Sequence, residues 1–158
     1  MTKRQEFTVL KTYPEFEIRE YKPCVIAEVK SSSNYSDAGS SAFGSLFSYI
    51  SKGNNAEEAI AMTAPVITAK RFDNLTENEW FVSFVMPAGS TLADMPLPIN
   101  SKVVLRELAA EICVAASFRG KATTALSAQK IAALRAAAEK QNVTLSEETR
   151  VARFDPPF

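Results

Sequence analysis

Histidine is missing from all 158 residues of this chain, and its absence limits the chemistry that the remaining side chains could perform. Ser-His-Asp triads, Cys-His dyads and His-ligated metal ions are all excluded. The carboxylates Glu57, Glu58, Glu107 and Glu111 have no spacing that would bring two of them together as an acid and a base. No glycine-rich loop precedes an expected helix, which argues against a phosphate cradle. The sequence therefore predicts a non-enzymatic protein, with no catalytic residues and no metal site.

The two cysteines are the remaining residues with redox or ligand chemistry. Cys24 and Cys113 lie far apart in the sequence, each inside an apolar run where a small buried hydrophobe would also be placed. Buried free thiols are the favoured interpretation, and a disulfide is the alternative.

Composition and charge narrow the class of protein further. The 158 residues fit one domain spanning 1–158, and an apolar fraction of 46% suffices for a hydrophobic core. The 18 basic and 18 acidic residues leave no net charge, which argues against nucleic acid or an anionic membrane surface as a partner. No apolar run approaches the roughly 20 residues of a membrane span, and the N-terminal MTKRQEFTVL lacks the features of a secretory signal. We therefore expect a cytoplasmic protein.

The elements that must position these residues form a weak internal repeat. Two extended segments near the N-terminus predict a hairpin, and two later segments repeat its pattern. The four predicted strands are 16–21, 24–29, 103–108 and 112–118. Arg106-Glu107 takes the place of Arg19-Glu20, and Cys113 nearly takes the place of Cys24.

A helix is expected after each hairpin. In the first helix a stripe spaced i, i+3, i+4 and i+7 would face the core, and it consists of Phe43, Leu46, Phe47 and Ile50. Asp37 is its expected N-cap, and residues 53–55 are its expected end. The second helix has a stripe of Ile131, Leu134 and Ala138, a start capped by Thr124 or Ser127, and Asn142 in the left-handed position after its end.

Beyond each helix the chain is expected to return to a sheet. Residues 66–72 and the doubly apolar 80–86 follow the first helix, whereas 149–154 alone follow the second. Two β-β-α-β-β halves related by a pseudo-twofold would give about eight mostly antiparallel strands with two helices on their faces. Because the last strand is missing, one edge is left unpaired. Three explanations of the missing strand stay open: the sequence was shortened, the natural chain is short, or another chain covers that edge.

The uncharged stretch AMTAPVITA, residues 61–69, needs an explanation in a chain with so little other chemistry. Pro65 has no N–H to give to a central ladder, so we expect a strand entry at 63–66 with Pro65 at its first residue or at a bulge. Met62 would then lie between helix and sheet. A strand entry that fixes the helix to the sheet is the favoured interpretation, and the lining of a binding cleft is the alternative.

The same stretch carries a resemblance to a known family. Ala61-Met62-Thr63-Ala64-Pro65-Val66 resembles the most recognisable motif of the SOUL haem-binding protein family, and four further stretches match that family in the right order. They are YPEFEIREY at 13–21, FSYI at 47–50, MPLP at 95–98 and FDPP at 154–157. The family normally continues past that last turn into a final strand, which agrees with the strand missing from the repeat.

The resemblance implies a fold and a function. The implied fold is α+β, a distorted antiparallel β-barrel of about eight strands flanked by two helices, similar to the effector-binding domains attached to some bacterial transcription regulators. The implied function is binding of haem or another tetrapyrrole by a carrier or buffer. An apolar cleft with cations at its rim would hold a b-type haem without a protein ligand to the iron, and the absence of any cofactor is the alternative.

The candidate site follows from carrying the family's apolar helix surface over to this chain. The cofactor-binding candidates are Phe47, Tyr49, Ile50, Met62 and the rim cation Lys52, with Lys70 and Arg71 as further rim cations. An iron ligand, if there is one, would have to be Met62, Met86, Cys24, Cys113 or a tyrosine. Packing onto the sheet is the simpler explanation for the stripe residues, whereas Tyr49 lies off the stripe and needs another explanation.

Two other functions stay open. The chain could be a sensor or binding module for a different flat apolar molecule. It could also be a protein-interaction module that docks a partner peptide, or a second copy of itself, through an apolar cleft or an open sheet edge.

Overall fold

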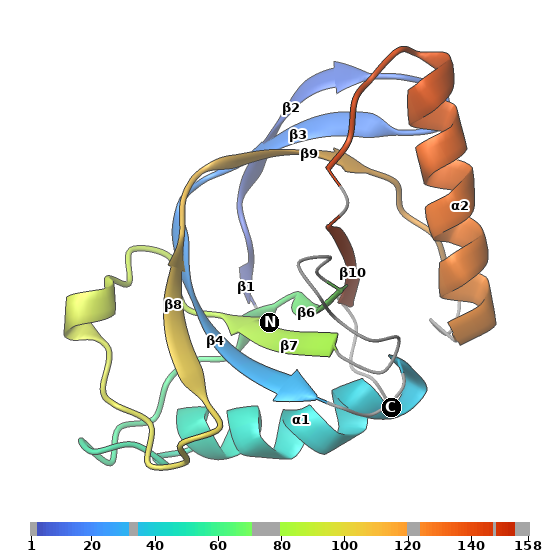
Figure 1. Cartoon of the computed structure of the whole chain (residues 1–158). Helices are drawn as coiled ribbons and strands as arrows, with labels where there is room; N and C mark the ends of the chain where they lie inside the picture. The colour runs from blue at the N-terminus through green and yellow to red at the C-terminus, as the bar shows by residue number, and fades with distance from the viewer. Residues whose placement is uncertain (1–2, 32–34, 71–79, 120–123, 147, 154–158) are drawn as a thin grey trace.

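Two antiparallel sheets and two helices make up the computed structural model, which describes residues 3–31, 35–70, 80–119, 124–146 and 148–153 (Figure 1). The five-stranded sheet has the order β10-β6-β7-β4-β8, the three-stranded sheet has the order β2-β3-β9, and β1 pairs with β5 in parallel. The strands are β1 Lys3–Arg4, β2 Phe7–Thr12, β3 Glu17–Tyr21, β4 Cys24–Ser31, β5 Thr63–Ala64, β6 Val66–Lys70, β7 Trp80–Val85, β8 Val104–Leu108, β9 Glu111–Ala115 and β10 Thr149–Arg153. The helices are α1 Tyr35–Ile50, α2 Thr124–Lys140 and the short 3₁₀ helix η1 Leu92–Asp94.

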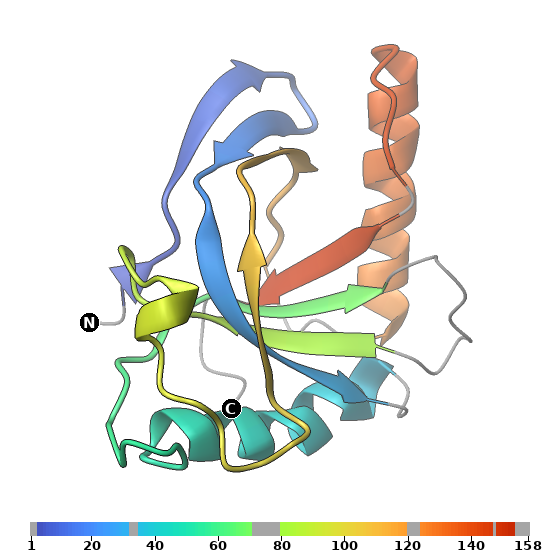
Figure 2. The same ribbon diagram turned by 60° about the vertical axis from the view of Figure 1, so that its left-hand side comes forward.

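The helices cover different sheets. α1 packs against the five-stranded sheet and α2 lies along the three-stranded sheet, as Figures 1 and 2 show. The α+β class and the two flanking helices agree with the sequence-based prediction. The ladders of the described residues do not close into a barrel, so that part of the prediction stays unconfirmed.

The predicted hairpins are wrong in their pairing, although their strands are right. β3 does not pair with β4 but with β2 and β9, and β4 pairs with β7 and β8. The two-residue link Lys22-Pro23 carries the chain from one sheet into the other. Proline lacks the N–H that a tight two-stranded ladder would use at this position.

Strand pairing between the two halves obeys the pseudo-twofold residue by residue. Arg19 pairs with Cys113 and Ile26 pairs with Arg106, and the same shift in residue number carries Arg19 to Arg106 and Ile26 to Cys113. β6 and β10, which are counterparts in the two halves, pair with each other. The register corrects one prediction: Cys113 occupies the place of Ile26, not of Cys24.

Three of the four residues of the predicted stripe of α1, Phe43, Leu46 and Ile50, pack against the sheet as predicted, but Tyr49 is buried in place of Phe47. Tyr49 is buried at 1% exposure together with Leu46 and Ile50, whereas Phe47 is 49% exposed and Phe43 is half-buried. The helix begins at Tyr35, so the predicted N-cap Asp37 lies inside it. Apolar residues cover more than one face of this helix, so packing against the sheet decides whether Phe47 or Tyr49 is buried.

The ends of both helices are closed in the same way. The N–H of Gly53 donates to the carbonyl of Ser48 at 2.8 Å, with Lys52 at a φ of 78° between them. The N–H of Val143 donates to the carbonyl of Ala138 at 3.0 Å, with Asn142 at a φ of 60°. Both ends are Schellman closures, and Asn142 confirms its prediction. In α2, Thr124 is the first residue, whereas Ser127 lies within the helix and is not its cap.

Gly53 is required by close approach of the backbone. A Cβ at this position would lie 2.4 Å from the carbonyl oxygen of Ser48. We therefore expect Gly53→Ala to lower the free energy of unfolding by about 1–3 kcal/mol. Urea denaturation measures the change.

Gly44 provides the matched control, because a Cβ there has no neighbour within 4 Å and the residue lies inside α1. Gly44→Ala is expected to raise the free energy of unfolding by up to about 1 kcal/mol. Equal effects of the two substitutions would contradict the account of the helix end.

Candidate functional site

The stretch at residues 61–66 ties three parts of the fold together. The hydroxyl of Thr63 donates to the carbonyl of Val85 on β7, and the carbonyl of Ala64 accepts the N–H of Gln5 at 2.7 Å. Met62 packs against the core under α1, and buried Pro65 separates β5 from β6. The predicted strand entry at Thr63 is confirmed, with Pro65 at an interruption of the strand as expected for a residue without an N–H.

Two of the five candidate binding residues belong to the core. Ile50 is buried, and Tyr49 is buried with its hydroxyl donating to the carbonyl of Pro96 at 2.7 Å. This hydrogen bond holds the MPLP segment against the FSYI segment of α1, so two of the family-like stretches meet. The position of Tyr49 off the predicted apolar stripe is thus explained by its structural role in this hydrogen bond.

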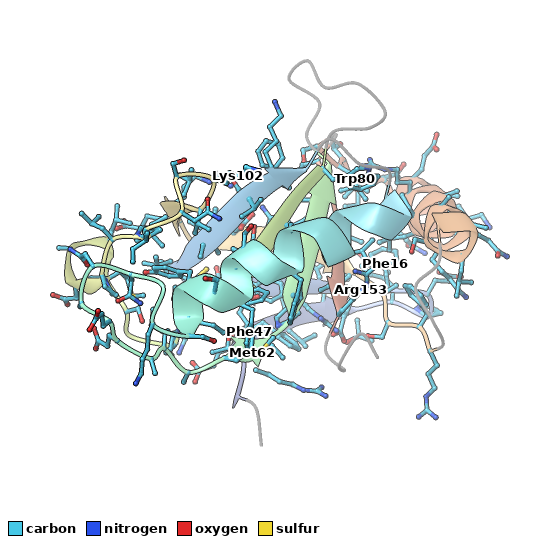
Figure 3. All side chains as sticks on the ribbon, turned by 90° about the horizontal axis from the view of Figure 1, so that it is seen from below. Phe16, Phe47, Met62, Trp80, Lys102 and Arg153 are labelled. Carbon is cyan, nitrogen blue, oxygen red and sulfur yellow. The ribbon has the colours of Figure 1, made fainter. Side chains whose placement is uncertain are left out.

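The other three candidates lie toward the outside, at the C-terminal part of α1. Phe47 stacks on Phe43 with ring centroids 5.9 Å apart and an interplanar angle of 14°. Seen from below, Phe47 and the half-buried Met62 lie on the same flank of the helix (Figure 3). Exposed Lys52 follows the last turn of α1. The side chain of Lys70 and the whole of Arg71 are outside the described residues.

The loop beside this surface is organised by one buried amide. The side chain of Asn54 donates to the carbonyls of Tyr49 and Glu58 at 3.0 and 2.8 Å, and it accepts from the N–H groups of Ala56 and Glu58. Buried polar groups are stable only when they are hydrogen-bonded in this way. In the sequence, Asn54 was recognisable only as part of the helix end at 53–55, and its role in the loop was not predicted.

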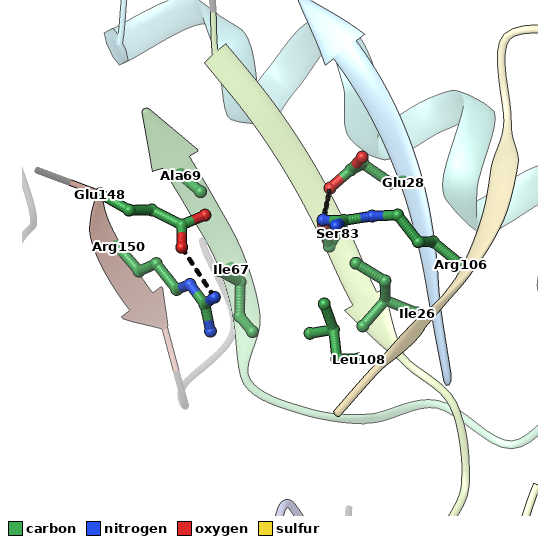
Figure 4. A pocket seen from close by; sticks show the side chains of 9 residues that line it. All are labelled: Ile26, Glu28, Ile67, Ala69, Ser83, Arg106, Leu108, Glu148 and Arg150. Carbon is green, nitrogen blue, oxygen red and sulfur yellow. Dashed lines mark hydrogen bonds and ion pairs between the residues drawn. The ribbon is translucent and has the colours of Figure 1, made fainter. Parts of the chain in front are cut away.

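A second site, which was not predicted from the sequence, lies on the face of the five-stranded sheet opposite α1. It is a recess of about 250 Å³, counted with the solvent at its mouth. Figure 4 shows its lining side chains: Ile26, Glu28, Ile67, Ala69, Ser83, Arg106, Leu108, Glu148 and Arg150. Glu28 and Arg106 stand on one side and Glu148 and Arg150 on the other, with apolar side chains between them (Figure 4).

Ion pairs dominate this recess. The carboxylate of Glu28, only 6% exposed, accepts from Arg106 at 3.1 Å and from the hydroxyl of Ser83 at 3.4 Å. Arg150 donates to both carboxylate oxygens of Glu111 at 2.8 and 2.9 Å and to Glu148 at 3.0 Å. Burial lowers the pKa of Arg150, but its hydrogen bonds and charge pairs with Glu111 and Glu148 outweigh burial and raise the pKa. The alternation of charged and apolar residues along each strand could have predicted this charged face from the sequence.

The groups proposed as iron ligands differ in protonation and in burial, and so in how readily they could bind a metal. Burial raises the pKa of the thiols of Cys24 and Cys113, and Glu111 adds to it, so both thiols keep their protons at neutral pH. Burial, with a contribution from Glu58, raises the pKa of Tyr49 to about 12. Met86 is buried, which leaves the thioether of Met62 as a ligand atom that needs no deprotonation and lies toward the surface. The two cysteines are free thiols.

The fold and these sites define an α+β protein of two pseudo-symmetric halves, with an apolar surface on the first helix and paired charges on the opposite face of the sheet. A family model described as SOUL heme-binding protein matches residues 2–158, and the chain therefore belongs to that family. A search of curated proteins finds no match. Within the described residues, no cluster of three or more Cys, Asp or Glu side chains could hold a metal ion, and no helix is long and apolar enough to cross a membrane.

Because the pKa of Tyr49 is raised in the folded state, the free energy of unfolding should fall at alkaline pH. A folded-state pKa of about 12 against an ordinary value of 10 favours the neutral phenol in the folded state, so its contribution is complete below pH 10 and is lost as pH rises through 12. The wild type should lose about 1 kcal/mol more of its free energy of unfolding between about pH 8 and about pH 11 than Tyr49→Phe does. Urea titrations at the two pH values measure this difference. Parallel losses in both proteins would contradict the assignment.

The Arg150 cluster should contribute more to stability than an exposed ion pair. We expect Arg150→Met to lower the free energy of unfolding by about 2 kcal/mol, because it leaves two partly buried carboxylates without their partner. Lys22 forms a single exposed ion pair with Glu6 at 3.0 Å, so Lys22→Met should cost less than about 0.5 kcal/mol. Thermal or urea unfolding of both variants tests the contrast, and equal costs would show that the cluster adds nothing beyond a surface pair.

Proposed function

We propose that this protein binds haem or a related tetrapyrrole on the outer surface at the C-terminal part of α1, and that it acts as a carrier or buffer without catalysis. The observation that carries the proposal is the match of the SOUL heme-binding family to residues 2–158. It is supported by an exposed aromatic side chain, Phe47, at a position where the sequence resembles the family's apolar helix surface.

The chemistry of this surface suits a flat apolar ligand with anionic edges. Phe47 and Phe43 present stacked rings, and Met62 adds a polarisable, adaptable side chain on the same flank (Figure 3). Lys52 is an exposed cation at the end of the helix, where it can meet a propionate group. Tyr49 and Ile50 contribute from the core by holding the helix in place, and in the described conformation they offer no surface to a ligand.

The recess on the opposite face is less suitable for a tetrapyrrole. It has room for little more than a water-sized group, far less than pockets that hold drug-sized ligands, and a haem is larger still. Its charged groups are already paired with one another. A ligand there would have to break these ion pairs, at a cost in free energy.

The proposed mode of binding does not depend on a strong bond from the protein to iron. The thiols and Tyr49 hold their protons at neutral pH, so we expect a b-type haem held by apolar contact and rim charge, with Met62 as a candidate for a weak thioether ligand. We further propose that residues 1–158 act as one domain, and that the protein works in the cytoplasm, where its two thiols stay reduced.

A titration with ferric haem and with iron-free protoporphyrin tests this proposal. Both ligands should give saturable one-to-one changes in Soret absorbance, and their dissociation constants should agree within about tenfold because iron ligation contributes little. Phe47→Glu should weaken both by at least about tenfold, since a carboxylate would be desolvated against the ring.

Leu10→Glu is the matched control, because Leu10 is also 49% exposed but lies on β2 in the other sheet. It should leave both dissociation constants within about twofold of the wild-type values. Absence of saturable binding in protein shown to be folded by circular dichroism would overturn the proposal. Equal losses in the two variants would move the site away from α1.

A further inference from the structure

One buried side chain closes the segment that leads from α1 to the AMTAPV stretch. Asn54 is 0% exposed, and its amide nitrogen donates to the carbonyls of Tyr49 at 3.0 Å and Glu58 at 2.8 Å. Its amide oxygen accepts the N–H groups of Ala56 at 3.3 Å and Glu58 at 3.0 Å. The hydrogen-bonding capacity of the amide is thus used in full, and the last turn of α1 is joined to residue 58.

The closed loop fixes the place at which the chain returns along the end of the helix. Ser51 and Ala59 form an antiparallel bridge, and the N–H of Ile60 donates to the carbonyl of Ile50 at 2.8 Å. Met62 follows shortly afterwards and packs against the core under α1. Its position therefore depends on how the loop closes, and the Asn54 amide makes that closure.

The proposed ligand-binding groups lie on both sides of this closure in the chain. Lys52 stands before Asn54 in the left-handed conformation, with a φ of 78°. Met62 comes after it, on the flank of α1 that also carries Phe47 (Figure 3). A side chain without exposed surface thus holds the cation and the thioether at set places relative to the aromatic ring.

The outer side of the loop is held differently, by residues 97–99. The N–H of Asn55 donates to the carbonyl of Leu97 at 2.9 Å, and the N–H of Leu97 donates to the side-chain oxygen of Asn55 at 2.8 Å. The N–H of Ile99 donates to the carbonyl of Gly53 at 3.1 Å. In its hydrogen bond to Leu97 the side chain of exposed Asn55 is an acceptor, a role that a carboxylate can take over.

We propose that Asn54 is a positioning residue of the tetrapyrrole surface on α1, an inference that rests on the proposed function. Asn54 orders the loop before a ligand arrives, so that Met62 and Lys52 are already held in the geometry that binding requires and need not be immobilised by the ligand. Asn54 does not touch the ligand, and its whole contribution passes through the loop.

Asn54→Asp tests this role, because a carboxylate accepts hydrogen bonds but cannot donate to the carbonyls of Tyr49 and Glu58. With the loop released, the dissociation constants of ferric haem and of iron-free protoporphyrin should both rise at least about fivefold. Asn55→Asp is the matched control, since it makes the same chemical change at the next residue and still accepts the N–H of Leu97. Both dissociation constants should then stay within about twofold of the wild-type values.

The methionine methyl groups distinguish positioning from a general loss of stability. In ligand-free Asn54→Asp, NMR of isotope-labelled methionine methyls should show the Met62 signal shifted and broadened, because its segment is no longer held in one place. The signal of Met86, which is buried in the core under α1, should stay as in the wild type.

Asn54→Ser is the second variant, and it replaces Asn54→Asp if that protein does not fold. A hydroxyl can donate to only one of the two carbonyls, so we expect a rise of about threefold in both dissociation constants.

The wild type and the variants separate failure of this inference from failure of the proposed function. If the wild type binds both ligands and Asn54→Asp binds them as well as Asn55→Asp does, the positioning role is overturned and the proposed function stands. Equal changes of the Met62 and Met86 signals would also overturn the positioning role, because the substitution would then act on the whole core. If the folded wild type binds neither ligand, the proposed function fails and the positioning role fails with it.

Discussion

The exchange of strands between the two halves is the constraint on which the rest of this structure depends. β3 and β4 are consecutive in the chain but lie in different sheets, and each pairs with a strand of the second half. Neither half can therefore complete a sheet alone, and the ladders β3–β9 and β4–β8 form only when both halves are folded. Such non-local pairing makes the register of each ladder depend on the other.

This arrangement sorts the side chains into two environments. Alternate residues of the strands face the helices and form apolar clusters, while the intervening residues face inward and include the ion pairs of Glu28 and Arg150. Charges are tolerated there because each guanidinium has a carboxylate within hydrogen-bonding distance, and an unpaired charge in that position would be costly. The ligand surface proposed on α1 is separate from this network, on the outside of the fold.

The stretch AMTAPV shows how a motif can serve the fold and the proposed site together. Thr63 and Ala64 tie β5 to β7 and to the N-terminal segment, and Met62 reaches the core under α1 on the flank that also carries Phe47. The position of Met62 and the orientation of the helix therefore depend on the same few hydrogen bonds. A ligand on α1 would be sensitive to the anchoring of this segment.

The sequence by itself determined the class of fold, the strands β3, β4 and β6 to β10, the two helices and the internal repeat, because period-2 and period-3.6 patterns and turn residues are local signals. Asn142 and the strand entry before Pro65 were predicted for the same reason. The strands β1 and β2 were not predicted. Only the tertiary structure decided that β3 and β4 belong to different sheets, that Tyr49 rather than Phe47 faces the core, and that Asn54 and Arg150 organise their surroundings. These outcomes depend on partners far away in the chain, such as Pro96 for Tyr49 and Glu111 for Arg150, and no local pattern carries that information.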